Sequence, residues 1–165
     1  MNYQKLLIMQ NDLDNHIMQK QKLQFIKLSA LTLALSTELS EVVNSYQLWK
    51  YWKVNNQPKE DLLEEVADFT HFLLSLSNRF HIDGKTINEI GAVKYTEVET
   101  HFLQMQYTAS MIGVFGEASD KQHYVKIMWK LFKGMLEHLG FTEEQVFEAY
   151  LKKNQTNYER QESNY

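Results

Sequence analysis

Cysteine is absent from this sequence, and its 165 residues include only one proline and six glycines. Without cysteine the chain has no disulfide, no thiolate zinc site and no cysteine nucleophile. Folds built from many short strands use proline and glycine at their turns, so the scarcity of both argues against a β-sandwich or β-barrel. The length suits one domain with one core, and we expect residues 1–165 to form it.

An excess of positive charge is also lacking, because 17 basic residues stand against 21 acidic ones and give a net charge of −4. We therefore expect no direct binding to nucleic acid. The uncharged segments 28–37 and 100–116 are too short or too polar for a membrane-spanning helix, which needs about 20 apolar residues. The first residues lack the apolar stretch of a signal peptide, and the simplest expectation is a cytoplasmic protein without a membrane segment.

Apolar residues recur at helical spacing along most of the chain. This pattern predicts an all-α bundle of five or six helices. A capping-box pattern in 142–145 starts the last of them, and Gly140 ends the one before it. The expected helices cover residues 3–20, 22–53, 58–80, 86–116 with an interruption at Gly91, and 142–153, and residues 154–165 form a polar tail. One more helix is expected to start after Ser119 or Asp120, each a suitable N-cap, and to end at residue 139.

Two pairs of carboxylates interrupt the apolar stretches. Glu38 and Glu41 are three residues apart in one predicted helix, and Glu65 and Asp68 repeat this spacing in the next. Residues three apart lie on one face of a helix, at about 5–6 Å between their Cβ atoms. Because only a short break joins the two helices, antiparallel packing would bring both pairs together.

Four carboxylates that face one another in a bundle repel, and their desolvation is costly unless a cation compensates them. Oxygen ligands alone suit Mg²⁺ or Mn²⁺ rather than zinc, and Mg²⁺ held by carboxylates keeps positions for water and phosphate oxygens. The pattern therefore indicates a metal site for a phosphate substrate. A solvated helix surface is the alternative, since glutamate pairs three residues apart are common on helices.

These motifs resemble those of a known family. The two carboxylate pairs are similar to the signature of the all-α NTP pyrophosphatase (MazG-like) superfamily, and the best match within it is the dimeric dUTPase family of bacteria, phages and kinetoplastids. Three segments narrow the resemblance, which covers residues 10–165: the aromatic and lysine cluster 49–53, the segment 71–75 and the tail segment 153–161.

The resemblance implies Mg²⁺-dependent hydrolysis of dUTP to dUMP and pyrophosphate through attack of water on the α-phosphate. It implies that two or more Mg²⁺ ions are held by Glu38, Glu41, Glu65 and Asp68, and that Glu38 orients or deprotonates the water. It further implies that Trp52 and Phe72 contact the uracil and that Gln10, with a contribution from Asp14, lines the base pocket. The implied phosphate contacts are Lys53, Lys153, Asn157 and Arg160. The implied substrate-binding residues are Gln10, Trp52, Lys53, Phe72, Lys153, Asn157 and Arg160.

The resemblance also implies a homodimer and, if the protein is phage-encoded, a repressor protein as a partner. Two positions depart from the family pattern. Thr37 stands where some relatives carry a third glutamate, and Asn164 stands where many have a glycine before the final tyrosine. The use of dUDP and the subunit that supplies the tail stay open.

Other functions remain as alternatives. A MazG-like or dCTPase-like enzyme would keep the carboxylates and act on another nucleoside triphosphate. A di-iron carboxylate bundle is suggested by the spacing of Asp68 with His71 and of Asp120 with His123. A non-catalytic helical interaction module is the third alternative. From its position alone, Gln10 is expected on the surface of the first helix, and Trp49 and Trp52 are expected on one helical face.

Overall fold

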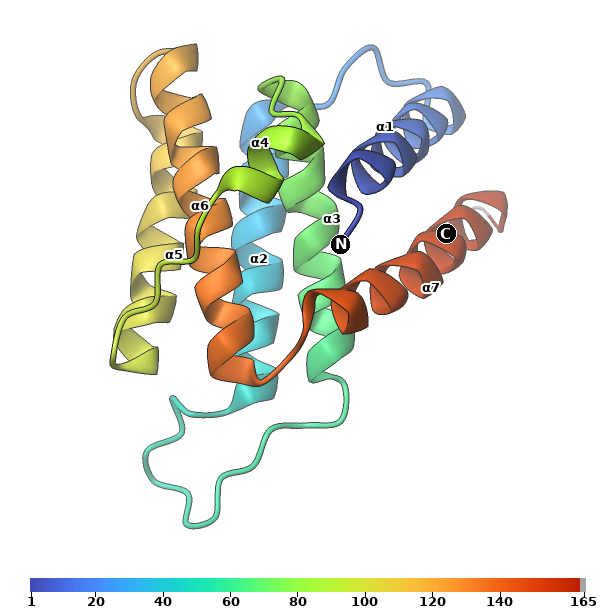
Figure 1. Cartoon of the computed structure of the whole chain (residues 1–165). Coiled ribbons are helices and arrows are strands. Elements are labelled where there is room, and N and C mark those ends of the chain that lie inside the picture. Colours follow the sequence, from blue (N-terminus) through green and yellow to red (C-terminus); the bar gives the residue numbers. More distant parts are fainter. Residues whose placement is uncertain (164–165) are drawn as a thin grey trace.

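This computed structural model describes residues 1–163, which form seven helices joined by irregular connections and contain no strand (Figure 1). The all-α prediction is confirmed, and the helix count exceeds the predicted five or six because of a short additional helix. Asn164, which departs from the family pattern, lies outside the described residues. The helices are α1 (Tyr3–Lys20), α2 (Leu28–Tyr46), α3 (Leu62–Arg79), α4 (Gly84–Glu89), α5 (Val98–Val114), α6 (Ala118–Leu139) and α7 (Glu143–Glu162).

Helix α3 is the centre of the bundle, because it packs against α1, α2, α6 and α7. In Figure 1, α2, α3, α5 and α6 run nearly parallel, while α1 and α7 lie at an angle on the other side of α3. The largest fully buried side chains include Phe69 of α3 with Trp129 and Phe132 of α6. None of the helices within residues 1–163 combines the length and the apolar character of a membrane span.

Helix α2 is shorter than the predicted helix over 22–53. It ends at Tyr46 because Gln47 takes the left-handed conformation with φ 65°, and the Gln47 amide donates to the Val43 carbonyl. The connection that follows is held at its base, where the Lys59 amide donates to the Ser45 carbonyl at 2.8 Å. The result is an irregular connection, 47–61, that projects from one end of the bundle (Figure 1).

The aromatic residues of this connection gave the false helical signal. Trp49 and Trp52 have the spacing of a helical face, but here they lie in turns with 46% and 58% of their surface exposed. Their rings meet edge to face at 5.4 Å, which requires no helix. The prediction that Pro58 lies in the first turn of a helix is also wrong, since α3 begins at Leu62.

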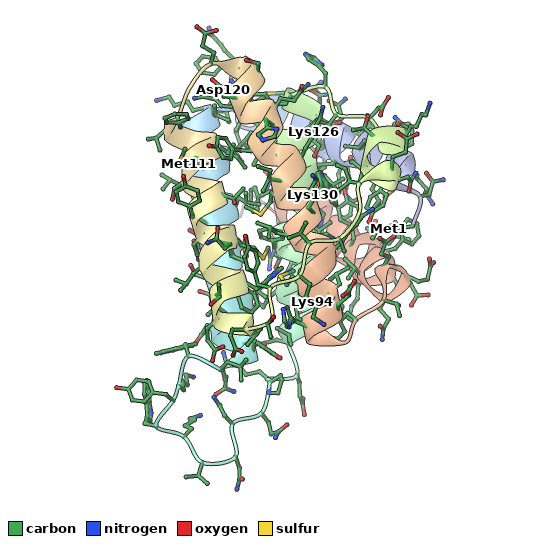
Figure 2. All side chains as sticks on the ribbon, turned by 60° about the vertical axis from the view of Figure 1, so that its left-hand side comes forward. Met1, Lys94, Met111, Asp120, Lys126 and Lys130 are labelled. Atoms are coloured by element: carbon green, nitrogen blue, oxygen red, sulfur yellow. The ribbon has the colours of Figure 1, made fainter. Side chains whose placement is uncertain are left out.

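The interruption predicted at Gly91 is confirmed and is larger than expected. Residues 90–97 are not helical, and they run across α6, as Figure 2 shows near Lys94 and Lys130. The Val93 amide donates to the Lys130 carbonyl at 2.9 Å. Gly134 permits this close approach, because a Cβ atom there would lie 2.1 Å from the Val93 carbonyl oxygen.

Helix α7 begins as predicted and ends later than predicted. The side chain of Thr142 accepts from the Gln145 amide in a capping box, and Gly140, at φ 73°, ends the preceding helix. The polar stretch after Lys153, which has no apolar stripe of its own, continues as helix to Glu162. It is supported by α1, since Lys20 Nζ lies 2.7 Å from a carboxylate oxygen of Glu162.

Candidate active site

Three of the four predicted carboxylates converge where α2 packs against α3. Glu38 of α2 and Glu65 and Asp68 of α3 each offer one oxygen, and these oxygens lie within 4.8 Å of one another. All three side chains are half-buried. Glu41 is exposed, and one of its oxygens accepts a long hydrogen bond of 3.5 Å from Asn44. The predicted pairing of the two helices is therefore present, with Glu41 at the rim.

The electrostatics of this group show how unfavourable three negative charges are here. Burial, with the neighbouring charges of Asp68 and Glu65, raises the pKa of Glu38 to about 7. Burial and the charge of Asp68 raise the pKa of Glu65, and burial raises that of Asp68. A divalent cation would favour the ionised forms of all three carboxylates, so the residues present fit such a metal.

Helix α7 supplies positive charge to the same place. Lys153 Nζ lies 2.7 Å from Asp68 Oδ2 and 2.7 Å from Glu64 Oε1, and the lysine side chain is only 10% exposed. One face of α7 carries Lys153, Asn157 and Arg160, because they are four and three residues apart. The positive charge of Arg160 contributes to lowering the pKa of Glu64 and opposes the raised pKa of Asp68. Two predicted phosphate ligands thus lie near the carboxylates, together with Glu64, which was not predicted.

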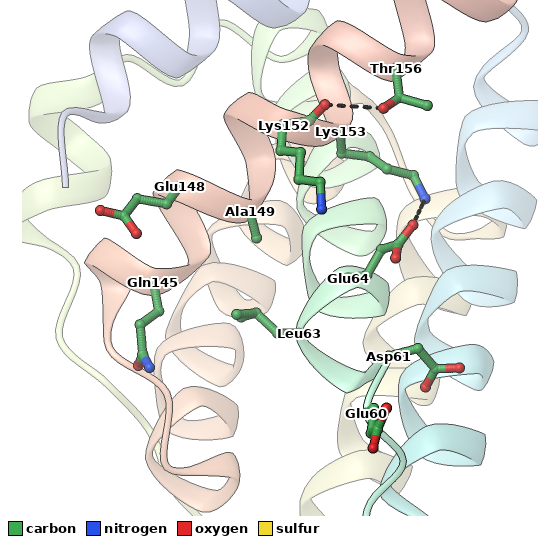
Figure 3. Close-up of a pocket in the computed structure, with 10 residues that line it drawn as sticks. All are labelled: Glu60, Asp61, Leu63, Glu64, Gln145, Glu148, Ala149, Lys152, Lys153 and Thr156. Carbon is green, nitrogen blue, oxygen red and sulfur yellow. Dashed lines mark hydrogen bonds and ion pairs between the residues drawn. The ribbon is translucent and has the colours of Figure 1, made fainter.

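A pocket of about 560 Å³ opens beside this ion pair, between the start of α3 and α7. Figure 3 shows Lys153 directed toward Glu64, with Lys152 and Thr156 on the same helix as Lys153. Leu63 and Ala149 add apolar surface. Glu38, Glu65 and Asp68 do not line this pocket, so it adjoins the convergent carboxylates only through Lys153, which is ion-paired with Glu64 and Asp68.

A buried polar group lies between α1, α3 and α7. Gln10 Nε2 donates to Asp14 Oδ1 at 2.9 Å, and Gln10 Oε1 accepts from the Tyr150 hydroxyl at 2.9 Å and from His71 Nδ1 at 2.7 Å. The rings of His71 and Tyr150 stack with their centroids 4.1 Å apart. Gln10 is only 3% exposed, so its expected surface position is wrong.

The partners of Gln10 determine the state of His71. Burial, with the nearby charge of Lys153, lowers the pKa of His71 to about 3, so the imidazole is neutral. Because Gln10 Oε1 accepts from it, the proton lies on Nδ1, an assignment that follows from the hydrogen-bond network. Nε2 is then an acceptor, and it has no hydrogen-bond partner among the described residues. No spacing pattern in the sequence indicated Tyr150 as a member of this group. Its partner His71 lies in the segment 71–75, which is one of those that narrow the family resemblance.

The remaining predicted substrate residues lie in two places. Trp52 and Lys53 belong to the 47–61 connection, where Trp52 contacts the Tyr51 ring at 5.2 Å and Lys53 Nζ donates to Gln47 Oε1 at 3.0 Å. Phe72 follows His71 on α3, is half-buried and packs against the core. The contacts of Trp52 and Lys53 in the described part of the chain are thus local to the connection.

The two aspartate–histidine pairs that suggested a di-iron site each contain a residue with another partner. His71 Nδ1 is bound to Gln10, as described above. Asp120 lies in the capping box at the start of α6, where its Oδ2 accepts from the Glu117 amide at 2.9 Å. The N-cap residue itself is Glu117, and not Ser119 or Asp120. Within residues 1–163, the acidic group that could hold a metal contains no histidine.

An all-helical bundle that gathers carboxylates beside the basic face of another helix has the groups of a phosphohydrolase, because carboxylates bind hard cations and basic side chains bind phosphate oxygens. A family model described as dUTPase matches residues 2–165. The chain therefore belongs to the dUTPase family, and it is an enzyme that hydrolyses dUTP to dUMP and pyrophosphate. A search of curated proteins found no match.

Proposed function

We propose that the enzyme requires Mg²⁺, or Mn²⁺ in its place, and that Glu38, Glu65 and Asp68 hold the metal together with Glu41 from the rim. The observation that supports this most is the convergence of three carboxylate oxygens within 4.8 Å. Oxygen-only ligands favour these two hard cations. When bound, a divalent cation neutralises phosphate charge and lowers the pKa of water.

Glu38 is our candidate for the residue that orients the attacking water and takes its proton. It is the only member of the convergent group that comes from α2, so it faces the two ligands of α3. A cation would lower the pKa of Glu38 again and leave a carboxylate able to accept a proton. Water would attack the α-phosphorus, the bond to the bridging oxygen of the β-phosphate would break, and pyrophosphate would leave.

The basic face of α7 is proposed to bind the triphosphate. Lys153, Asn157 and Arg160 share this face, and Lys153 is within 2.7 Å of Asp68. An ammonium and a guanidinium stabilise the charge of the leaving pyrophosphate, and arginine adds bidentate geometry. Lys53 would add a further contact from the connection after α2.

The uracil is proposed to lie near Gln10 and Phe72, with Trp52 closing over it from the connection. Gln10 and its partner Asp14 belong to the buried polar group next to α3, and Phe72 is on the same helix as Asp68. Trp52 is 58% exposed, so its indole is accessible to a ligand. A base with its own donors and acceptors suits such a mixed polar and aromatic surface.

A homodimer is the proposed assembly. Exposed apolar side chains on α5 and in the 47–61 connection support it, with Leu103 68% exposed, Tyr107 55% exposed and Val54 89% exposed. Leu103 and Tyr107 are one turn apart on α5, and exposed apolar patches commonly mark protein interfaces. Light scattering of the purified protein should give twice the chain mass of 19.6 kDa. The repressor partner, the cytoplasmic location and a single domain over 1–165 stay predictions from the sequence.

The test is release of pyrophosphate from dUTP, dCTP, dTTP and UTP, each measured with Mg²⁺, with Mn²⁺ and with EDTA. We expect strong release from dUTP with either metal and none with EDTA. Release of phosphate from dUDP is measured alongside. Metal-independent hydrolysis of dUTP would overturn the proposed metal site, and equal release from dCTP would overturn the proposed base pocket.

A further inference from the structure

Lys153 binds two carboxylates that have different surroundings. Its Nζ is 2.7 Å from Asp68 Oδ2 and 2.7 Å from Glu64 Oε1. Asp68 is one of the three residues whose oxygens converge, whereas Glu64 is outside that group. The Asp68 side chain is 17% exposed and that of Glu64 is 61% exposed. One ammonium therefore connects the candidate metal site with a carboxylate at its edge.

Metal binding changes the interactions of this ammonium. A divalent cation at the convergent oxygens and the ammonium on the same Asp68 carboxylate would repel each other. The Lys153 backbone is fixed within α7 and its side chain is 10% exposed, so the ammonium has few places to go. Glu64 lies four residues before Asp68, one turn along the same face of α3, and it already accepts the ammonium.

We propose that Glu64 is a positioning residue. It keeps Lys153 at the edge of the candidate metal site when a divalent cation binds to Asp68. The inference rests on the proposed function, since it assumes a metal at the convergent carboxylates and a triphosphate beside α7. Glu64 lowers the cost of metal binding by giving the displaced ammonium a partner. The same contact leaves Lys153 next to the pocket shown in Figure 3, where it meets a phosphate oxygen.

The test is a double-mutant cycle on metal affinity in the absence of nucleotide. Free Mn²⁺ is counted by electron paramagnetic resonance during titration of the wild type, Glu64→Gln, Lys153→Met and the double variant. We expect Glu64→Gln to weaken Mn²⁺ binding about three- to tenfold, because Lys153 then returns to Asp68. In the Lys153→Met background the same change should alter the affinity by less than about twofold.

The matched control is Glu60→Gln, which removes another exposed carboxylate from the same pocket. This variant should change Mn²⁺ affinity by less than about twofold in either background, because Glu60 has no ion pair with Lys153 among the described residues. An equal loss from Glu64→Gln with and without Lys153 would overturn the inference and identify Glu64 as a direct ligand or a distant charge. Failure of the wild type to bind Mn²⁺ would overturn the metal site as well.

Discussion

Aromatic residues pack on one side of helix α3, whereas charged and polar residues meet on its other side. Toward α6, Phe69 stacks on Phe132 with ring centroids 5.9 Å apart, and Phe132 meets Trp129 edge to face at 5.4 Å. Toward α1, α2 and α7, Asp68 converges with Glu38 of α2 and is ion-paired with Lys153 of α7, and His71 is hydrogen-bonded to Gln10 of α1. One side buries apolar surface, and the other buries groups that prefer water.

The difference separates stability from function. Burial of the aromatic side stabilises the fold through the hydrophobic effect and close packing. The carboxylates on the polar side are held where burial raises their pKa values, so ionising them opposes folding unless a cation is present. A substitution on the polar side should therefore reduce activity with little loss of stability, and one on the aromatic side should do the reverse.

The largest expected effect is that of Glu38→Gln on activity. This change removes charge and keeps volume, so we expect dUTP turnover to fall about 10³- to 10⁴-fold, or about 4–5.5 kcal/mol, with the helical fold retained. Pyrophosphate release under saturating dUTP measures the loss, and circular dichroism checks the fold. The exposed Glu137 of α6 provides a control, because Glu137→Gln should keep turnover within about twofold. Turnover of Glu38→Gln near that of the wild type would contradict the proposed role.

Phe132→Ala should have the next largest effect, this time on stability. Phe132 is fully buried between Phe69 and Trp129, so the cavity should lower the free energy of unfolding by about 3–4 kcal/mol. Urea denaturation measures it. Ile8→Ala, at a side chain 55% exposed, should change the same quantity by less than about 1 kcal/mol. If Phe132→Ala abolished turnover while the protein stayed folded, the separation of the two sides would not hold.

A smaller effect is expected from pH in the absence of metal. The pKa of Glu38 rises from 4.5 to about 7 in the folded protein, so the folded state binds this proton more tightly than the unfolded state. The stabilisation is present below pH 4.5 and is lost as the pH rises toward 7. Since Glu38 is half-buried and screened by water, we expect a loss of about 1–2 kcal/mol.

Urea denaturation with EDTA at several pH values measures this loss as the difference between the wild type and Glu38→Gln. The variant lacks the titrating group, so its stability should vary less with pH over this range. Excess Mg²⁺ should remove most of the difference, because metal binding favours the ionised carboxylate. An identical pH dependence in both proteins would show that Glu38 does not hold its proton in the folded state.

Local patterns predicted the fold and the carboxylate group well. Apolar spacing predicted the bounds of α1, and the three-residue spacing of Glu65 and Asp68 put two carboxylates on one helix face. These features depend on residues within one or two helical turns of each other. The end of α2 was not predictable in this way, because the left-handed Gln47 follows no glycine or proline signal.

Long-range contacts account for the other differences. The polar stretch after Lys153 is helical because it packs on α1, where Lys20 binds Glu162 across 142 positions of sequence. Gln10 is buried because it meets Tyr150 across 140 positions. A sequence pattern confined to one helix carries no information on such partners, so a polar residue on a predicted helix looks exposed.

The most direct test of the metal site is the anomalous scattering of Mn²⁺ in crystals of the enzyme with a non-hydrolysable dUTP analogue. We predict a peak within about 2.5 Å of carboxylate oxygens of Glu38, Glu65 and Asp68, with the triphosphate between this peak and Lys153. A Mn²⁺ peak away from these carboxylates, or a triphosphate bound elsewhere on the bundle, would contradict the account.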